Sequence, residues 1–199
     1  MTTPAPKLFD SDKIILDLCG GTGAWSKPYA DAGYDVRVIT LPEQDVTDYI
    51  PPKNVYGILA APPCTEFSLA LNGHPERPRD FVAGMMPVNA CIRIIHQSMP
   101  VFWALENPVG LISRWIGQHR YIFHPWMFGD PYTKWTALWG NFKKPVKKYT
   151  DRTAVMTGDQ IIRCRENRKP QDSGTRKQKS IKRSITPPGF AKAFYEANS

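Results

Sequence analysis

The sequence lacks an apolar run long enough to cross a membrane, and it lacks any cysteine pair with CxxC spacing. A membrane helix needs about 20 consecutive apolar residues, so we expect a soluble protein. The first 13 residues, MTTPAPKLFDSDK, have no apolar core of the kind found in signal peptides. We therefore expect an intracellular protein with free thiols. The histidines have no zinc-ligand spacing with the cysteines, so we also expect no metal site.

Acidic residues are scarce in one part of the chain. Residues 143–183 contain 14 Lys/Arg and 4 Asp/Glu, a local charge of +10, in a chain whose net charge is +8. The remaining residues together are therefore slightly acidic. Such a basic segment is either a solvated loop or a phosphate-binding surface. We favour phosphate binding because structured sequence resumes after the segment.

Short apolar runs alternate with segments that can form helices. The runs predicted to be strands are 13–18, 36–41, 55–61 and 101–107. The predicted helices are 24–34, a stretch within 80–98, 108–117 and 185–198. This alternation is typical of a parallel α/β sheet. Residues 120–142 predict two further strands, as a hairpin at the sheet edge.

Three chemically useful groups follow the predicted strands. Asp17 lies beside a glycine-rich turn, Cys64 follows two prolines, and Glu106 ends the fourth strand. In open α/β sheets, ligands bind at the carboxyl ends of the strands. We therefore predict that these segments converge on one site. The prolines fix φ and so restrict the loop that holds the thiol.

The turn DLCGGTG, residues 17–23, matches neither GxGxxG nor the phosphate-binding loop GxxxxGK[ST]. Glycines after a strand let a ligand approach the backbone, but they also form purely structural tight turns. The pattern alone leaves both possibilities open.

Read together, DLCGGTGAWS, APPCTEFS and ALENP resemble, in this order, the motifs of the DNA cytosine-C5 methyltransferase family. TKWTALWGN stands in the place of a later arginine-containing strand, and SITPPGFAKAF is similar to the motif that completes the cofactor pocket. The resemblance covers most of residues 13–142 and 184–198. The short, Pro-rich form is similar to phage-encoded members, which implies the cytoplasm of a bacterial host.

The resemblance implies a Rossmann-like, S-adenosylmethionine-dependent methyltransferase fold with a mostly parallel sheet and a reduced target-recognition segment. It implies that Cys64 is a nucleophile adding to carbon 6 of cytosine and that Glu106 holds the ring N3 and exocyclic amine. Lys134 stands where the family has its first arginine, and Thr136 replaces the second. The implied reaction is methylation of carbon 5 of cytosine in DNA.

The resemblance also implies which residues bind the cofactor and which bind DNA. The implied S-adenosylmethionine contacts are Asp17, Leu18, Cys19, Gly21, Thr22, Gly23, Trp25, Thr40, Asp45, Val46 and Pro62. The implied DNA contacts are Pro63, Ser68, Asn107, Lys143, Lys144, Lys147 and Lys148. Thr40 replaces the acid that the family uses for the ribose hydroxyls. Trp25 is equally consistent with a core aromatic, and the free cysteines other than Cys64 are read as structural.

We expect three parts: a catalytic core over 1–142, a basic DNA-contacting segment over 143–183, and a helix over 184–199 that returns to the core. The segment 68–80 is read either as a mobile loop that closes over a flipped base or as an ordinary surface loop. Because so little chain remains for target recognition, we expect a short or relaxed sequence preference and a monomer. Two alternatives stay open: a methyltransferase for tRNA or free cytidine nucleotides, and a non-catalytic DNA-binding module on a degenerate methyltransferase fold.

Overall fold

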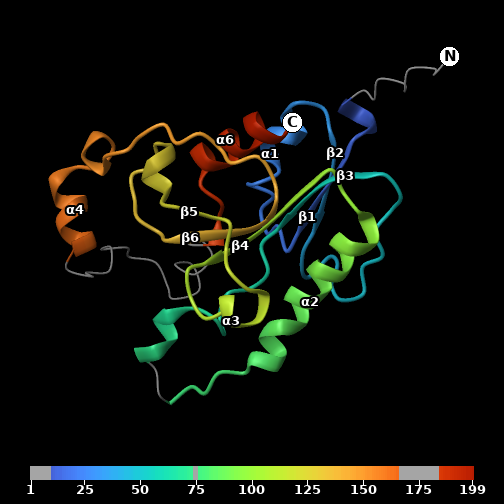
Figure 1. Cartoon of the computed structure of the whole chain (residues 1–199), viewed down its shortest axis with the longest axis horizontal. Helices are drawn as coiled ribbons and strands as arrows, with labels where there is room; N and C mark the ends of the chain where they lie inside the picture. The colour runs from blue at the N-terminus through green and yellow to red at the C-terminus, as the bar shows by residue number, and fades with distance from the viewer. Residues whose placement is uncertain (1–9, 74–75, 166–183) are drawn as a thin grey trace.

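The computed structural model describes residues 10–73, 76–165 and 184–199 of the 199-residue chain. A six-stranded sheet with the order β2-β1-β3-β4-β6-β5 forms its centre (Figure 1). The strands are β1 (Ile14–Leu18), β2 (Asp35–Ile39), β3 (Val55–Ala60), β4 (Phe102–Pro108), β5 (Tyr121–Phe123) and β6 (Thr136–Asn141).

The first four strands are parallel to one another, whereas β6 runs antiparallel to both of its neighbours. The chain passes from β1 outward to β2, then crosses to the other side of β1 to form β3 and β4. This reversal of direction next to β1 is the topological switch point of a doubly wound sheet. The fold is therefore α/β and Rossmann-like, with a mostly parallel sheet, as the sequence predicts.

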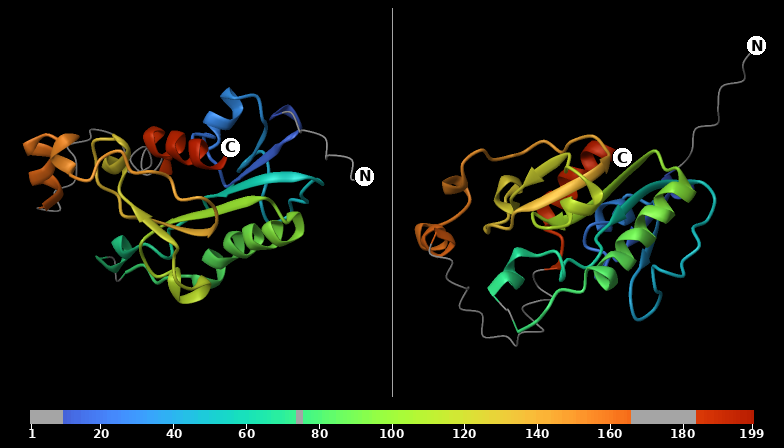
Figure 2. Two further views of the ribbon diagram at one scale, coloured as in Figure 1. Left: turned by 45° about the horizontal axis from the view of Figure 1, so that its top comes forward. Right: turned by 60° about the horizontal axis from the view of Figure 1, so that its bottom comes forward.

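Helices cover both faces of the sheet, which makes three layers (Figure 2). The α-helices are α1 (Lys27–Asp31), α2 (Phe81–Ser98), α3 (Ser113–Ile116), α4 (Gly158–Arg165) and α6 (Pro188–Asn198). Four 3₁₀ turns, η1 to η4, cover Asp10–Asp12, Leu69–Gly73, Pro125–Phe128 and Arg152–Ala154. None of the helices among the described residues is both long and apolar enough to traverse a bilayer.

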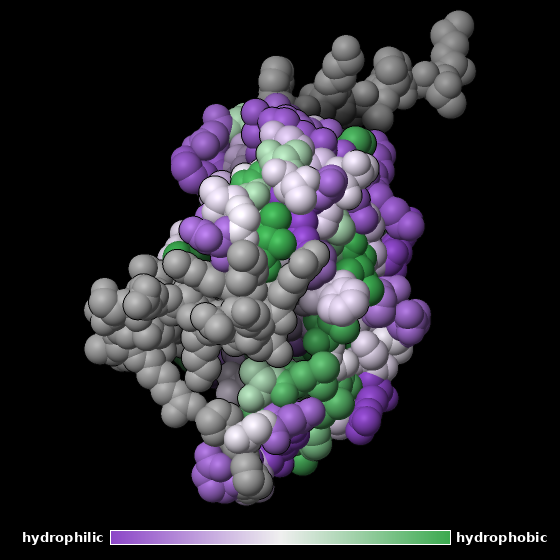
Figure 3. All heavy atoms as spheres, turned by 90° about the vertical axis from the view of Figure 1, so that its left-hand side faces the viewer, coloured by the Kyte–Doolittle hydropathy of each residue, from purple (hydrophilic) through white to green (hydrophobic). Residues whose placement is uncertain are grey.

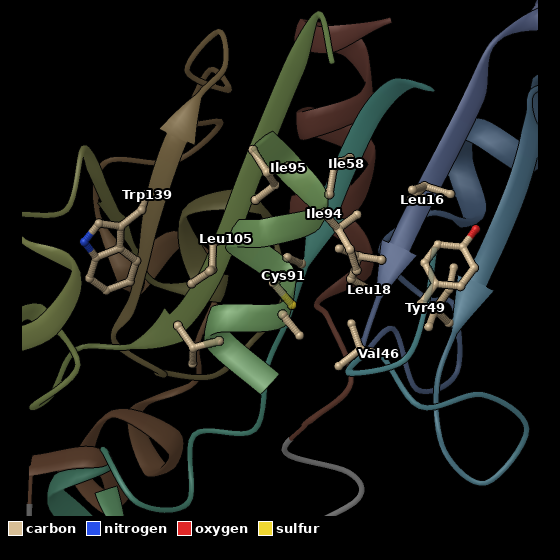
Figure 4. Packing of buried hydrophobic residues seen from close by; sticks show 14 of the residues in the cluster. Leu16, Leu18, Val46, Tyr49, Ile58, Cys91, Ile94, Ile95, Leu105 and Trp139 are labelled. Carbon is tan, nitrogen blue, oxygen red and sulfur yellow. The ribbon is translucent and has the colours of Figure 1, made fainter. Parts of the chain in front are cut away.

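One face of the sheet packs against α2 through aliphatic side chains. Cys91, Ile94 and Ile95 of α2 lie against Leu18 and Leu105 of the sheet (Figure 4). The other face packs against α1 and α6 through aromatic side chains. Tyr29 of α1 and Phe190 and Phe194 of α6 belong to that second cluster, together with Trp25, Phe102 and Phe123.

The predicted hairpin over 120–142 forms, but its first strand is short. Pro125 has no N–H to donate to a sheet ladder, and it starts the 3₁₀ turn η3 after only three strand residues. β6 pairs with β4 as well as with β5, so it lies between them and not at the edge. The sequence prediction of a hairpin at the sheet edge is therefore confirmed, with β5 as its outer strand and β6 as its inner strand.

Candidate functional site

One edge of the sheet gathers the predicted functional residues. The carboxyl ends of β1, β2 and β3 are tied together there, since Cys19 N–H donates to Ile39 O over 2.8 Å and Ala61 N–H to Leu18 O over 2.9 Å. Thr136, the first residue of the antiparallel β6, pairs with Pro108 at the end of β4. Residues just before β6 are thus delivered to the same edge as residues that end the parallel strands.

The glycine turn after β1 folds back over Asp17. A Cβ at position 20 would overlap the Asp17 carboxyl group, so only glycine fits there. Gly21 and Gly23 have φ values of +55° and +69°, a region that favours glycine. Gly21 is exposed, and a Cβ on it would meet nothing within 4 Å. The turn therefore offers open backbone to a ligand, as the cofactor prediction requires.

Asp17 is fully buried beneath this turn. Its Oδ2 accepts a 2.6 Å hydrogen bond from Ser26 Oγ, while its buried Oδ1 has no hydrogen-bond partner. Burial raises the pKa of Asp17 from 3.8 to about 6, against the opposing effect of the Ser26 hydrogen bonds. Since the structure satisfies only one of its two carboxylate oxygens, Asp17 has acceptor capacity left.

We expect Asp17→Asn to change the pH dependence of stability. Between pH 3.8 and about 6 the native protein binds more protons at Asp17 than the unfolded chain does. The free energy of unfolding therefore falls with rising pH in that window, by about 3 kcal/mol from this group alone. Asp17→Asn should remove that decline, which urea unfolding below and above the window measures. Asp48→Asn, at an exposed position, is the control and should keep the decline; an identical decline in Asp17→Asn would contradict the assignment.

Cys64 starts a tight turn after β3. Its carbonyl oxygen accepts hydrogen bonds from the N–H groups of Phe67 and Ser68, at 3.0 and 2.9 Å. The thiol is half-buried, and burial is the main cause that raises its pKa, followed by the negative charge of Glu106. The positive charge of Lys134 acts in the opposite direction. Both charged groups therefore lie within electrostatic range of the thiol.

Glu106 and Lys134 form an ion pair beside this thiol. Lys134 Nζ lies 3.3 Å from Glu106 Oε1, and their side chains are 24% and 16% exposed, respectively. The three residues come from separate segments: the turn after β3, strand β4 and the approach to β6. A nucleophile, a carboxylate and a cation thus meet at the carboxyl edge of the sheet, in a site that is partly open to solvent.

Asn107 links the end of β4 to the segment that follows β3. Its side chain is fully buried, and its Nδ2 donates a 3.0 Å hydrogen bond to the carbonyl oxygen of Pro62. This bond joins the Cys64 turn to the residue beside Glu106. The DNA contact that the motif implies for Asn107 stays a prediction; in the structure the buried side chain links the two segments. The sequence gives no signal of this role, since the bond joins positions 45 residues apart.

Two arginines hold the segment after Cys64 through hydrogen bonds and an ion pair. Arg79 donates to the carbonyl oxygens of Glu66 and Ser68 and to Asn72 Oδ1, at 2.5, 2.9 and 2.6 Å. Arg77 pairs with Glu66 Oε1 at 2.7 Å. Residues 74–75 of the predicted mobile loop lie outside the described residues. Closure of the segment over a substrate stays a prediction.

The remaining predicted cofactor residues differ in how far their side chains are buried. Leu18 and Val46 are buried in the aliphatic core (Figure 4), so contact with a ligand would come through their backbone. Trp25 is 2% exposed and packs against α6, which favours its reading as a core aromatic. Asp45 is exposed, and its Oδ1 accepts two 2.8 Å bonds from Thr47. Thr40 is half-buried just after β2.

Two thiols touch beneath the glycine turn. A hydrogen bond with Cys91 lowers the pKa of Cys19, whose φ of +56° is rare for a residue other than glycine. Cys19 also packs against the aliphatic core. Thr22 is exposed on the turn, whereas Pro62 is buried.

The predicted DNA contacts after β6 are exposed. Lys143, Lys144, Lys147 and Lys148 all have exposed side chains, as has Pro63 next to Cys64, whereas Ser68 is half-buried. The rest of the basic segment, residues 166–183, lies outside the described residues. The lysines are therefore available to phosphate groups, and their role stays a prediction.

Exposed apolar side chains lie on α2 and α3. Trp115 of α3 is 42% exposed and packs against Phe81 and Phe67, with ring centroids 4.6 and 5.7 Å apart. Val82 and Met86 of α2 are 80% and 57% exposed. Figure 3 views the molecule from the left of Figure 1 and shows apolar residues gathered in a band across the lower half of that face.

Comparison with known proteins adds little to this geometry. No protein-family model matches the chain, and no curated protein does. One similar solved structure is the crystal structure of a candidate DNA modification methyltransferase encoded within an E. coli prophage. Its TM-score is 0.46 at 18% identity, over 65% of this chain and 46% of that chain. The match spans less than half of that chain, and at this level of similarity it assigns neither family nor activity.

Proposed function

We propose that this protein methylates carbon 5 of cytosine in DNA, with S-adenosylmethionine as methyl donor and Cys64 as the covalent nucleophile. The observation that carries the proposal is the meeting of Cys64, Glu106 and Lys134 at the carboxyl edge of the sheet. A thiol and a carboxylate together can activate a pyrimidine ring for methyl transfer. The order of the sequence motifs, which resembles the cytosine-C5 family, supports the same reaction.

The chemistry explains why these residue types are needed. Carbon 5 of cytosine is a weak nucleophile, and addition of the Cys64 thiolate to carbon 6 converts the ring into an enamine. Glu106 donates a proton toward N3 as negative charge develops on the ring. After carbon 5 has gained its methyl group, loss of the carbon 5 proton expels the thiolate and restores the aromatic ring. Lys134 holds Glu106 and supplies positive charge beside the thiol.

The charges around Cys64 explain when the thiol becomes reactive. Burial and the Glu106 carboxylate raise its pKa, so the thiol of the free protein is held protonated. When a base binds, the Glu106 carboxylate and the ring N3 share a proton taken up from solvent, which reduces the negative charge beside the thiol. The Lys134 charge then favours loss of the thiol proton to solvent. The arrangement therefore couples activation of the nucleophile to binding of the base.

The glycine turn fits the proposed cofactor. Gly21 exposes its backbone beside open space, and Asp17 keeps one buried oxygen without a partner. Thr40 and Asp45 follow β2, which is the strand that pairs with β1. From there they can bind the nucleoside part of the cofactor. S-adenosylmethionine, when bound, supplies a methyl group on a positively charged sulfur. The chain's own part is to hold that group at the edge where Cys64 lies.

A trapping experiment tests the proposal. DNA that contains 5-fluorocytosine cannot lose a proton from carbon 5, so it should remain covalently joined to Cys64 when S-adenosylmethionine is supplied. We expect a protein–DNA band that resists denaturation, for wild type and for Cys164→Ala, and none for Cys64→Ala. An adduct in Cys64→Ala would contradict the assignment. If wild type binds the DNA but forms no adduct, methyl transfer to tRNA and to dCMP should be measured, because the same site could serve those substrates.

A further inference from the structure

Three aromatic rings form a continuous stack near the proposed active site. The His124 ring lies parallel to both Trp126 and Trp135, at 17° and 24°, with centroids 6.2 and 5.5 Å apart. Trp126 is 8% exposed, whereas Trp135 is 60% exposed. The neighbouring His124 ring already restricts the conformation of this exposed indole. Binding of a ligand to it therefore costs little side-chain conformational entropy.

The stack borders a cleft with polar and cationic lining. The cleft has a volume of about 430 Å³ and is lined by His124, Trp126, Thr133, Thr150, Asp151 and Arg152. The charges of Arg152 and Lys147 act on His124, whose pKa is lowered mainly by burial. Asp151 is the one acid in the lining, and its Oδ1 accepts from Thr153 N–H at 2.9 Å. Neutral flat rings beside two cations suit a ligand that has both a flat ring and a negative charge.

The stack is joined directly to the catalytic edge. Trp135 follows Lys134, whose Nζ contacts Glu106, and consecutive Cα atoms are about 3.8 Å apart. The carbonyl oxygen of Trp135 accepts a 3.0 Å hydrogen bond from Val109 N–H, just beyond Asn107 of β4. His124 follows Phe123, which pairs with Thr136 at the start of β6. The platform is therefore fixed to the strands that carry the reacting groups.

We propose that the Trp126–His124–Trp135 stack binds an unpaired nucleobase next to the target cytosine, with Arg152 and Lys147 holding the adjoining phosphate. This deepens the proposed function and rests on DNA being the substrate. A base inside a duplex has both faces covered by its neighbours, so only a base released from the stack can lie on Trp135. Extrusion of a target cytosine disturbs its neighbours, and the platform would hold one of them.

Binding measurements on single-stranded DNA test this inference without depending on methyl transfer. The probes are a fluorescein-labelled oligo(dT) and an abasic oligonucleotide of the same length, followed by fluorescence anisotropy. We expect wild type to bind oligo(dT) more tightly than the abasic strand. Trp135→Ala should weaken oligo(dT) binding roughly 5- to 150-fold, the range that corresponds to the loss of one stacked base. It should leave binding of the abasic strand nearly unchanged.

Two further variants sharpen the result. Trp135→Phe keeps a flat ring and should retain most of the preference for oligo(dT). Ile50→Ala removes another side chain that is 83% exposed and should behave as wild type. Equal binding of both strands by wild type, or unchanged oligo(dT) binding in Trp135→Ala, would overturn the inference.

The two proposals can fail separately. Loss of the base preference in Trp135→Ala supports the stack even if no 5-fluorocytosine adduct forms. An adduct through Cys64 together with unaffected Trp135→Ala binding would keep the proposed function and remove the stack. Tighter binding of oligo(U) than of oligo(dT) would count against DNA as the ligand and overturn this assignment.

Discussion

Replacing Glu106 with glutamine should lower the rate of methyl transfer by about 10²- to 10⁴-fold, the contribution typical of a general acid or base. Glutamine keeps the size of the side chain and its hydrogen-bonding capacity, but it has no proton to give to N3. We expect DNA binding to change little, because the side chain is only 16% exposed and its proposed contact is with the flipped base, not with the DNA backbone. Single-turnover transfer of labelled methyl groups measures the rate, and anisotropy measures the binding.

The Glu106→Gln variant should also change the reactivity of the Cys64 thiol. Since the Glu106 charge raises the pKa of Cys64, Glu106→Gln should lower that pKa and speed alkylation by iodoacetamide at neutral pH. Lys134→Met should raise the pKa and slow alkylation. Glu196→Gln, whose side chain is 59% exposed on α6, is the matched control for both measurements. Full activity with unaltered alkylation in Glu106→Gln would show that the carboxylate does not act on Cys64.

Replacing Phe190 with alanine should cost about 3–5 kcal/mol of the free energy of unfolding. Phe190 is fully buried, and its ring stacks on Phe123 with centroids 4.0 Å apart and an interplanar angle of 13°. It also contacts Trp25, Phe128 and Phe194. Domains typically have a stability of only about 5–15 kcal/mol, so one ring supplies a large share. Guanidinium unfolding measures the loss.

Lys192→Ala provides the comparison on the same helix. Its side chain is 76% exposed, so the change should stay within about 0.5 kcal/mol. A loss below about 1 kcal/mol in Phe190→Ala would mean that α6 contributes little to the core. That result would also undermine the predicted return of residues 184–199 to the catalytic core.

The strands and the convergence of the site were predictable because their signals are local. Apolar runs end at Asp17, Cys64 and Glu106, and parallel strands bring their carboxyl ends to one edge. Lys134 could be assigned only through the resemblance of its motif. Its delivery to that edge depends on β6 running antiparallel beside β4, which the pattern of residues 120–142 does not specify.

Other features could not be predicted because they depend on long-range contacts. Asn107 resembles a DNA-contacting residue in sequence, yet its amide reaches Pro62 and is buried. The roles of Arg79 and Trp126 arise from partners that only the folded chain brings near. Trp25 shows the same limit, since nothing local distinguishes a core indole from one that lines a pocket.

The position of α6 in the chain has a consequence for biosynthesis. All six strands leave the ribosome before residues 188–198 follow, so the part of the aromatic face that α6 covers stays exposed during that interval. A nascent chain halted before Pro188 would present Trp25, Phe102 and Phe123 to water. Exposed apolar surface of this kind promotes aggregation. Premature termination late in translation should therefore yield insoluble product even though every proposed catalytic residue has been made.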